Sequence, residues 1–239
     1  MSLLHRPEVR RLLSRHLLCR VEGVHGRFAL TFDDGPSPRN TPKLLEVLER
    51  RGARATFFLL AGHVRRHPHL VRALVAAGHE LGVHGRHHLW PAALPDRCLA
   101  WEVQHTAAAI EAAAGVRPGL YRAPFGVLRP GQARRLRALG YEPVLGDIYP
   151  ADVRCRRAEP IVARVMPRLV AGSIVILHDA SVLGDRDRGA TIAAVEGILG
   201  EAARRGLEPS TVSGMVRDAG DGGAAPGARA PAALSPCRS

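Results

Sequence analysis

The chain has 239 residues, a formal net charge of +12 and a hydrophobic content of 46%. No apolar run approaches the roughly 18 residues that a membrane-spanning helix needs, and the basic N-terminus lacks the apolar segment of about 7–15 residues found in secretion signals, so we expect a cytoplasmic protein. Lys43 is the only lysine, and scattered arginines with few aromatic rings to stack on bases do not favour nucleic acid as a partner.

Strand-like and helix-like runs alternate along the chain. The patterns predict seven strands, at residues 28–32, 55–60, 79–83, 119–122, 143–147, 173–178 and 207–212. Six helices are predicted between them, at about residues 41–52, 68–78, 97–114, 130–140, 158–170 and 189–205. Strict alternation indicates an α/β fold with parallel strands and helical crossovers, either an open doubly wound sheet or a barrel.

The two ends of the chain differ from this pattern. In residues 1–24, leucines and arginines alternate with roughly helical spacing, which predicts a basic amphipathic helix that packs on the barrel; a membrane-surface anchor is the alternative. Residues 217–239 are rich in alanine, glycine and proline, and we expect them to be a disordered tail. Residues 25–216 remain as the domain that contains the alternating strands and helices. No pattern in the sequence sets an oligomeric state.

The four cysteines share no metal-binding or redox spacing. They lie far apart in the sequence, at Cys19, Cys98, Cys155 and Cys237. Without a secretion signal, the simplest interpretation is that all four are free thiols.

Chemically capable side chains follow the predicted strands. Parallel α/β folds bind ligands at the carboxyl ends of their strands, so these residues are expected to meet there. The residues at such positions are Asp33, Asp34, His84, His88, Arg122, Asp147, Asp152 and His178.

Three of these residues could hold a metal ion. His84 and His88 are four residues apart, which on a helical turn brings them close enough to share one ion. The pair alone is weak evidence in a chain with twelve histidines, but the adjacent Asp33 and Asp34 strengthen it. Two imidazoles and one carboxylate suit catalytic Zn²⁺, and a bound cation would explain why two acids end one buried strand.

His178 and Arg122 each have two interpretations. His178 could be a core histidine bonded to a backbone carbonyl, or a proton donor at a strand end that faces the site. Arg122 could form a surface ion pair, or it could orient a carboxylate of the site.

Four motifs occur in an order that resembles the polysaccharide deacetylases, carbohydrate esterase family 4, which includes chitin and peptidoglycan deacetylases. They are TFDDGP (31–36), HELGVHGRHH (79–88), YRAPFG (121–126) and IVILHD (174–179). The resemblance covers residues 28–212 and implies a distorted (β/α) barrel with about seven parallel strands.

The resemblance also implies a role for each matching residue. Asp33 matches the catalytic base and His178 the catalytic acid. The other matches are Asp34, His84 and His88 as metal ligands, Arg122 as the partner of the base, Asp152 as the partner of the acid, and Phe125, Tyr149, Val153 and Leu177 around the substrate and the oxyanion.

Three positions depart from the family pattern. Gly85 stands where Ser or Thr is usual, Tyr149 replaces an Asp, and Val153 replaces a Trp that lines the acyl pocket. The last change leads to the hypothesis of a roomier or differently shaped acyl pocket.

The predicted protein is a metal-dependent hydrolase that removes an N-acyl group, expected to be N-acetyl, from an amino-sugar substrate. Zn²⁺ is the expected ion, with Co²⁺ or Mn²⁺ as alternatives. The substrate could be a free sugar, an oligosaccharide, a lipid-linked glycan or a glycosylated metabolite. The alternatives are a carbohydrate-binding member of the fold with altered catalysis, or a deacylase for larger acyl groups on a glycosylated metabolite.

Overall fold

The computed structural model describes residues 16–182, 186–221 and 234–235. The helix expected in residues 1–24 therefore lies outside the described residues over positions 1–15. Among the described residues, no helix combines the length and the apolar character needed to cross a membrane.

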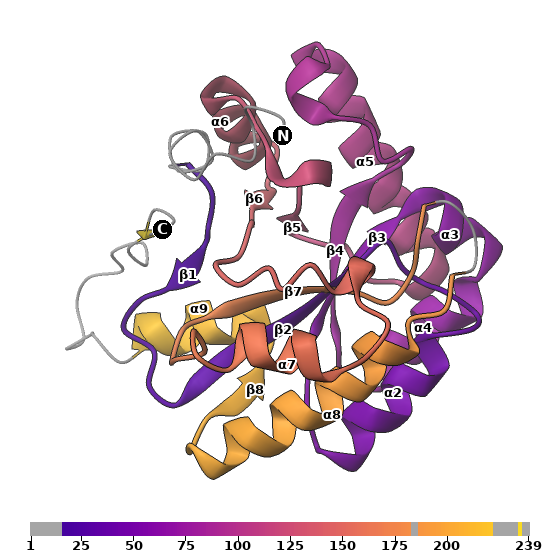
Figure 1. Ribbon diagram of the computed structural model, residues 1–239. Coiled ribbons are helices and arrows are strands. Elements are labelled where there is room, and N and C mark those ends of the chain that lie inside the picture. The colour runs from indigo at the N-terminus through magenta and orange to yellow at the C-terminus, as the bar shows by residue number, and fades with distance from the viewer. Residues whose placement is uncertain (1–15, 183–185, 222–233, 236–239) are drawn as a thin grey trace.

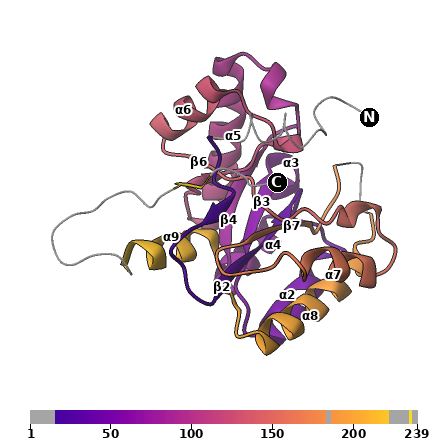
Figure 2. The ribbon, with the colours of Figure 1, turned by 60° about the vertical axis from the view of Figure 1, so that its left-hand side comes forward.

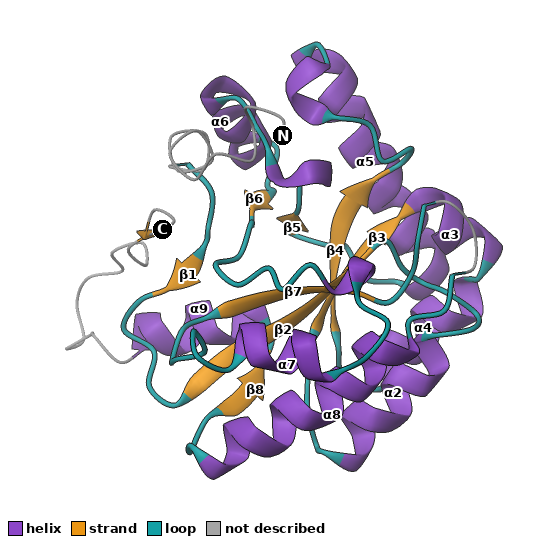
Figure 3. Ribbon diagram, viewed as in Figure 1, coloured by secondary structure: helices purple, strands orange, loops and turns teal. Residues whose placement is uncertain are grey.

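A curled parallel sheet forms the centre of the molecule (Figure 3). Its strands are β2 (Arg27–Asp33), β3 (Thr56–Leu60), β4 (Glu80–Gly85), β5 (Leu120–Tyr121), β6 (Glu142–Pro143), β7 (Ile174–His178) and β8 (Glu208–Ser210). The order across the sheet is β6-β5-β4-β3-β2-β7, and β8 also pairs with β2. All these pairs are parallel, so the predicted distorted (β/α) barrel is confirmed as a half-barrel.

Helices surround the outside of the sheet (Figures 1 and 2). They are α2 (Thr41–Arg50), α3 (Ala61–Arg66), α4 (Pro68–Ala76), α5 (Asp96–Ala114), α6 (Pro130–Ala138), α7 (Glu159–Val165), α8 (Gly189–Arg204) and α9 (Val212–Asp221). The six predicted helices are all present. The sequence analysis missed α3, a helix of six residues directly after β3, because so short a run shows no full period of apolar residues.

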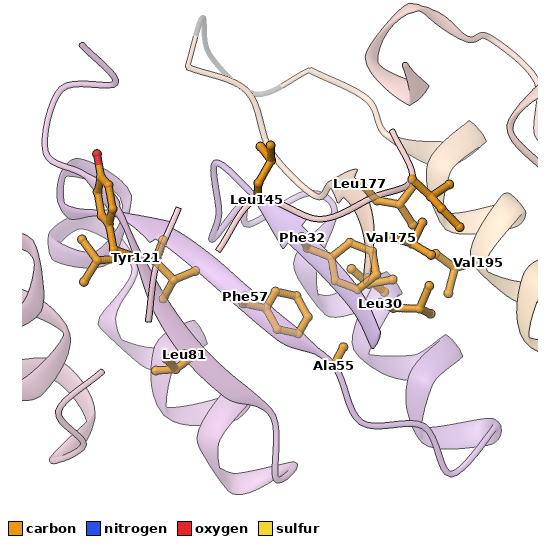
Figure 4. Packing of buried hydrophobic residues seen from close by; sticks show 14 of the residues in the cluster. Leu30, Phe32, Ala55, Phe57, Leu81, Tyr121, Leu145, Val175, Leu177 and Val195 are labelled. Carbon is orange, nitrogen blue, oxygen red and sulfur yellow. The ribbon is translucent and has the colours of Figure 1, made fainter. Parts of the chain in front are cut away.

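The strands supply the core because they are buried on both faces (Figure 4). Phe32 on β2 stacks on Phe57 of β3 with ring centroids 5.0 Å apart, and Leu30 and Val175 are fully buried nearby. Polar residues begin where these apolar runs end. The parallel register pairs Asp33 with His178, so two residues of the predicted site lie at the same edge of the sheet.

The gap between β6 and β7 is closed by the segment before and within β1 (Arg20–Val21). The amide of Leu18 donates to the carbonyl of Pro143 at 2.8 Å, and the amide of Val21 donates to the carbonyl of Gly172 at 3.0 Å. Leu18 is buried in a cluster with Val144, which follows β6, and Ile174, which begins β7. Residues 16–24, which the sequence analysis assigned to a separate N-terminal segment, are therefore part of the barrel.

The C-terminal region also differs from the expectation. The sequence analysis did not predict α9, which runs from Val212 to Asp221 and so crosses the boundary expected at residue 217. β9 (Leu234–Ser235) pairs antiparallel with β1. Cys98 and Cys155 are free, as predicted, but Cys19 is in a disulfide, so the prediction for that cysteine was wrong. Cys237 lies outside the described residues.

Candidate active site

Asp33 at the end of β2 is held by a buried arginine. Arg122 Nη1 donates to Asp33 Oδ1 at 2.7 Å and to Thr31 Oγ1 at 2.6 Å, and its side chain also lies over the ring of Phe58. Burial raises the pKa of Asp33, but the charge of Arg122 and the nearby imidazoles outweighs it, and the pKa lies below its usual value. Arg122 is 1% exposed, which excludes a surface ion pair. The structure therefore provides an ionised and oriented carboxylate.

Asp34, His84 and His88 form a cluster with the geometry of a metal site. Asp34 Oδ1 lies 3.6 Å from His84 Nε2 and 3.5 Å from His88 Nε2. Neighbouring ligands of tetrahedral zinc are separated by about 3.3 Å, close to these distances. Asp34 Oδ1 is buried and accepts no hydrogen bond from the described residues, so it has an unused lone pair that points at both imidazoles. These three residues fit a divalent cation.

The protonation states in this cluster also suit coordination. His84 Nδ1 donates to the carbonyl of Arg122 at 2.9 Å, which leaves the lone pair on Nε2. Burial lowers the pKa of His84 to about 4 and also lowers the pKa of His88, so both rings are neutral near pH 7. Burial and the adjacent Asp33 raise the pKa of Asp34. A cation would relieve that repulsion.

His178 at the end of β7 has the opposite character. Its Nδ1 donates to Asp152 Oδ1 at 2.9 Å, while the backbone amide of His178 and the hydroxyl of Thr191 both donate to Oδ2 at 3.0 Å. Burial lowers the pKa of His178, but Asp152 outweighs burial and raises it to about 9. The imidazole is therefore protonated near pH 7. Because its Nδ1 bonds to a carboxylate, His178 is no ordinary core histidine.

Strained backbone conformations lie around the site. Among the described residues other than glycine, positive φ angles occur at Asp34 (73°), His88 (53°), Phe125 (63°) and Ala151 (54°). Two of these are proposed metal ligands, one is the candidate oxyanion residue, and one precedes Asp152. Such conformations cost on the order of 1–3 kcal/mol each and persist where the surroundings fix them, typically at functional sites.

Gly85 also adopts a positive φ, 104°, between His84 and His88. A Cβ at this position would have room, since its nearest neighbours would be 3.9 Å away. The backbone conformation therefore explains the glycine, and the departure from Ser or Thr reflects more than the loss of a hydroxyl.

The predicted substrate residues differ in exposure. The Phe125 ring is 67% exposed and lies 4.8 Å from the His88 ring, and the Tyr149 ring lies 6.2 Å from that of His178. Val153 is partly exposed beside Asp152. Leu177 is fully buried in the core, so its contact with a substrate stays a prediction.

Asp147 does not join the site. Its Oδ1 accepts from the amide of Ile174 at 2.8 Å, and its Oδ2 lies 3.6 Å from Arg20, at the seam between β6 and β7. The prediction that Asp147 lies with the other strand-end residues was wrong. The chain after β6 runs beside β7 before it reaches Asp152, and Asp147 lies at the start of that stretch.

Sequence reasoning missed Asp179 as a support of the first aspartate loop. Asp179 is 1% exposed, accepts a hydrogen bond from Thr41 at the start of α2, and burial raises its pKa to about 7. A Cβ on Gly35 would lie 2.6 Å from Asp179 Oδ1, so the glycine after Asp34 lets this carboxyl approach. The motif IVILHD contains Asp179, but nothing local indicates that it packs against residue 35.

Comparisons with known proteins match this architecture. The family model described as Polysaccharide deacetylase matches residues 22–144. The chain is 35% identical to a peptidoglycan-N-acetylglucosamine deacetylase of Bacillus cereus over 191 residues, which covers 79% of this chain and 87% of the relative. It is also 35% identical to a chitooligosaccharide deacetylase of Rhizobium leguminosarum bv. trifolii over 150 residues, which covers 63% and 70% of the two chains.

A solved structure extends the similarity to three dimensions. The crystal structure of the Bc1960 peptidoglycan N-acetylglucosamine deacetylase superimposes with a TM-score of 0.77 at 25% identity, and the match covers 82% of this chain and 91% of that chain.

Proposed function

The chain belongs to the polysaccharide deacetylase family, and on that premise we propose which residues perform its reaction. The protein is a carbohydrate N-deacetylase that removes N-acetyl groups from an amino-sugar substrate. The observation that carries the assignment of roles is the contrast within one site. Asp33 is held ionised and His178 is held protonated, beside a cluster that fits a cation.

Asp34, His84 and His88 would hold the ion, for which we propose Zn²⁺ because the donor set mixes imidazole and carboxylate. When bound, a divalent ion at this cluster supplies a Lewis acid that polarises the substrate carbonyl and lowers the pKa of water. Residues of the chain supply the proton transfers.

Asp33 takes the proton of the attacking water as general base. Arg122 fixes the orientation of Asp33 through the 2.7 Å hydrogen bond and keeps its pKa low, so the carboxylate is available at neutral pH. The backbone amide of Phe125 donates to the oxygen on which negative charge develops.

His178 donates a proton to the departing nitrogen, and the C–N bond breaks to release acetate and the free amine. Asp152 holds the imidazole through Nδ1, which leaves the proton on Nε2 to be given away. Thr191 and the backbone amide of His178 hold Asp152 in turn. The base and the acid are thus supplied by different elements of the fold.

Acetate release from N-acetylglucosamine and its oligomers tests this function. The purified full chain should release acetate, lose activity with a chelator and regain it with Zn²⁺, Co²⁺ or Mn²⁺. The Asp33→Asn protein should bind as much metal as the wild type yet lose nearly all of its activity. Near-normal turnover by that variant would rule out the proposed base.

Val153 bears on the size of the acyl group that the enzyme accepts. The side chain is small and partly exposed beside Asp152, which supports the proposal that groups larger than acetyl are accepted. Rates for acetyl, propionyl and butyryl amides of the same sugar decide this. A strong preference for acetyl would contradict the proposal.

A further inference from the structure

A cavity of about 380 Å³ lies beside the acid half of the site. Asp152 and Val153 form part of its wall, so it begins at the residues that hold and flank His178. The described residues that line it include five arginines, which are Arg39, Arg154, Arg156, Arg186 and Arg188.

The charges of this arginine cavity are unbalanced. Two aspartates, Asp152 and Asp187, accompany the five arginines, which leaves a formal charge of +3 among the lining side chains that the structure describes. Asp152 is already bonded to His178, and Asp187 lies 3.4 Å from Arg39. A concave surface of one sign concentrates the potential and attracts an anion.

Three of the arginines have unused guanidinium groups. Among the described residues, no ion pair involves Arg154, Arg156 or Arg186, and all three are exposed. Some surface arginines elsewhere pair with acids, as Arg51 does with Glu196, whereas others, such as Arg97 and Arg134, have no ion pair among the described residues. Unpaired arginines are therefore common in this chain, and the distinctive feature of the cavity is that three of them gather there beside two further arginines.

Buried contacts fix the wall that carries Arg186 and Arg188. Asn40, which is fully buried, donates from Nδ2 to the carbonyl of Arg186 at 2.8 Å and accepts from the amide of Arg188 at 3.0 Å. Arg188 Nε donates to the carbonyl of Ala180 at 2.9 Å, and Arg188 is only 8% exposed. The first turn of the 16-residue helix α8 completes this wall, so the positive end of the helix faces the cavity.

We propose that the arginine cavity binds a phosphate group, as a phosphomonoester or a pyrophosphate, on the amino-sugar substrate. This inference rests on the proposed deacetylase function and names its substrate class. A dianion matches the excess of positive charge better than a single carboxylate does. A guanidinium group can also donate two parallel hydrogen bonds to the oxygens of one phosphate. Because the cavity adjoins Asp152, a phosphate bound there places the rest of the sugar toward His178.

Pyrophosphate binding to the full, Zn²⁺-loaded chain tests the cavity without reference to turnover. Calorimetry should detect binding to the wild type and a loss of about tenfold in affinity for each of Arg154→Gln and Arg186→Gln, since each removes charged hydrogen bonds. Arg157→Gln is the matched control, because Arg157 is a neighbouring exposed arginine outside the cavity lining. It should bind pyrophosphate like the wild type.

Acetate release then tests the substrate class. The kcat/KM for N-acetylglucosamine 1-phosphate should exceed that for N-acetylglucosamine and chitotriose at least tenfold, and the ratio should fall in the Arg154 and Arg186 variants. UDP-N-acetylglucosamine and a polyprenyl-pyrophosphate-linked N-acetylglucosamine form two further arms. Faster turnover of the UDP-linked sugar would identify a nucleotide as the group that carries the phosphate, and faster turnover of the polyprenyl-linked sugar would identify a lipid.

Several results would overturn the inference. Pyrophosphate binding that is absent from the wild type, or that survives unchanged when Arg154→Gln and Arg186→Gln are combined in one protein, would mean that the cavity is not a phosphate site. Rapid turnover of neutral oligomers with no gain from phosphate would refute it while the deacetylase function stands, as would a preference for N-acetylmuramic acid. If no substrate is turned over, the proposed function fails, and the binding measurement still decides on the cavity.

Discussion

The two halves of the active site contain the same kind of side chain in opposite states. His84 and His178 are both largely buried at strand ends, but burial lowers the pKa of His84 to about 4, whereas Asp152 overcomes burial and raises that of His178 to about 9. His84 Nδ1 bonds to a backbone carbonyl, and His178 Nδ1 bonds to a carboxylate. A single change of hydrogen-bond partner therefore separates the proposed metal ligand from the proposed proton donor.

The halves also differ in what supports them. The metal half is built on the end of β2, on β4 and on the turn after β4, and these two strands lie in the middle of the sheet with β3 between them. The acid half joins the last residue of β7 to Asp152 on a short helical turn (Asp152–Arg154) and to Thr191 on α8. The metal half depends on two strands of the same sheet, while the acid half depends on side-chain bonds across separate segments.

The largest expected effect is on activity, and it should separate the proposed base, Asp33, from the proposed metal ligand, His84. Asp33→Asn should lower kcat/KM by about 10³-fold and retain bound metal, because only the base is removed. His84→Ala should lose both, because a ligand is removed. Metal content and acetate release, measured on the same samples, test this. Equal metal loss in both variants would mean that Asp33 belongs to the metal half.

Asp152→Asn tests the acid half with a smaller effect. The amide keeps the shape but removes the charge that raises the pKa of His178, so kcat should fall by about 10²-fold near pH 7. The alkaline limb of the pH–rate profile should move to lower pH. An unchanged limb would show that Asp152 does not control the proton on His178.

The raised pKa of His178 also predicts a pH-dependent stability. The folded protein holds this proton between pH 6.5 and about 9, where the unfolded chain releases it, so the contribution is complete below pH 6.5 and is lost as pH rises to about 9. It amounts to on the order of 3 kcal/mol. Denaturant unfolding of the metal-free wild type and of His178→Gln should give free energies that converge over this range. A constant difference would contradict the raised pKa.

Gly85→Ala should have the smallest effect and should act on the metal half. Its φ of 104° is strained for alanine, so unfolding should become easier by about 1–2 kcal/mol. Gly131→Ala is the control, because Gly131 lies in α6 with no neighbour near an added Cβ and no positive φ. Equal midpoints of chemical unfolding for the two variants would refute the conformational explanation.

The sequence could predict the strands and most of the site for one physical reason. A buried parallel strand is a continuous apolar segment of the sequence, and the end of that segment marks the edge of the sheet. Asp33, His84 and His178 could therefore be placed at the same edge from their sequence positions alone. The ordered motifs then separated the base from the metal ligand.

The remaining features depend on pairings that no local pattern contains. Asp147 follows a strand as Asp33 does, yet it bonds to Ile174 at the seam. Leu18 looked like part of a surface helix, but its backbone fills the gap between β6 and β7. The arginine cavity also depends on distant pairings. Arg39, Arg154 and Arg186 are far apart in the sequence, and only the folded chain brings them together.

The seam between β6 and β7 has a consequence for the order of assembly. Arg20 bonds to Ser173 across 153 residues of sequence, so the first described segment of the chain cannot take its place until the ribosome has synthesised residue 173. Synthesis proceeds at about 5–20 residues per second, which leaves the N-terminal segment waiting for roughly ten seconds or more. The segment made early docks late, and the half-barrel remains open along one side until β7 emerges.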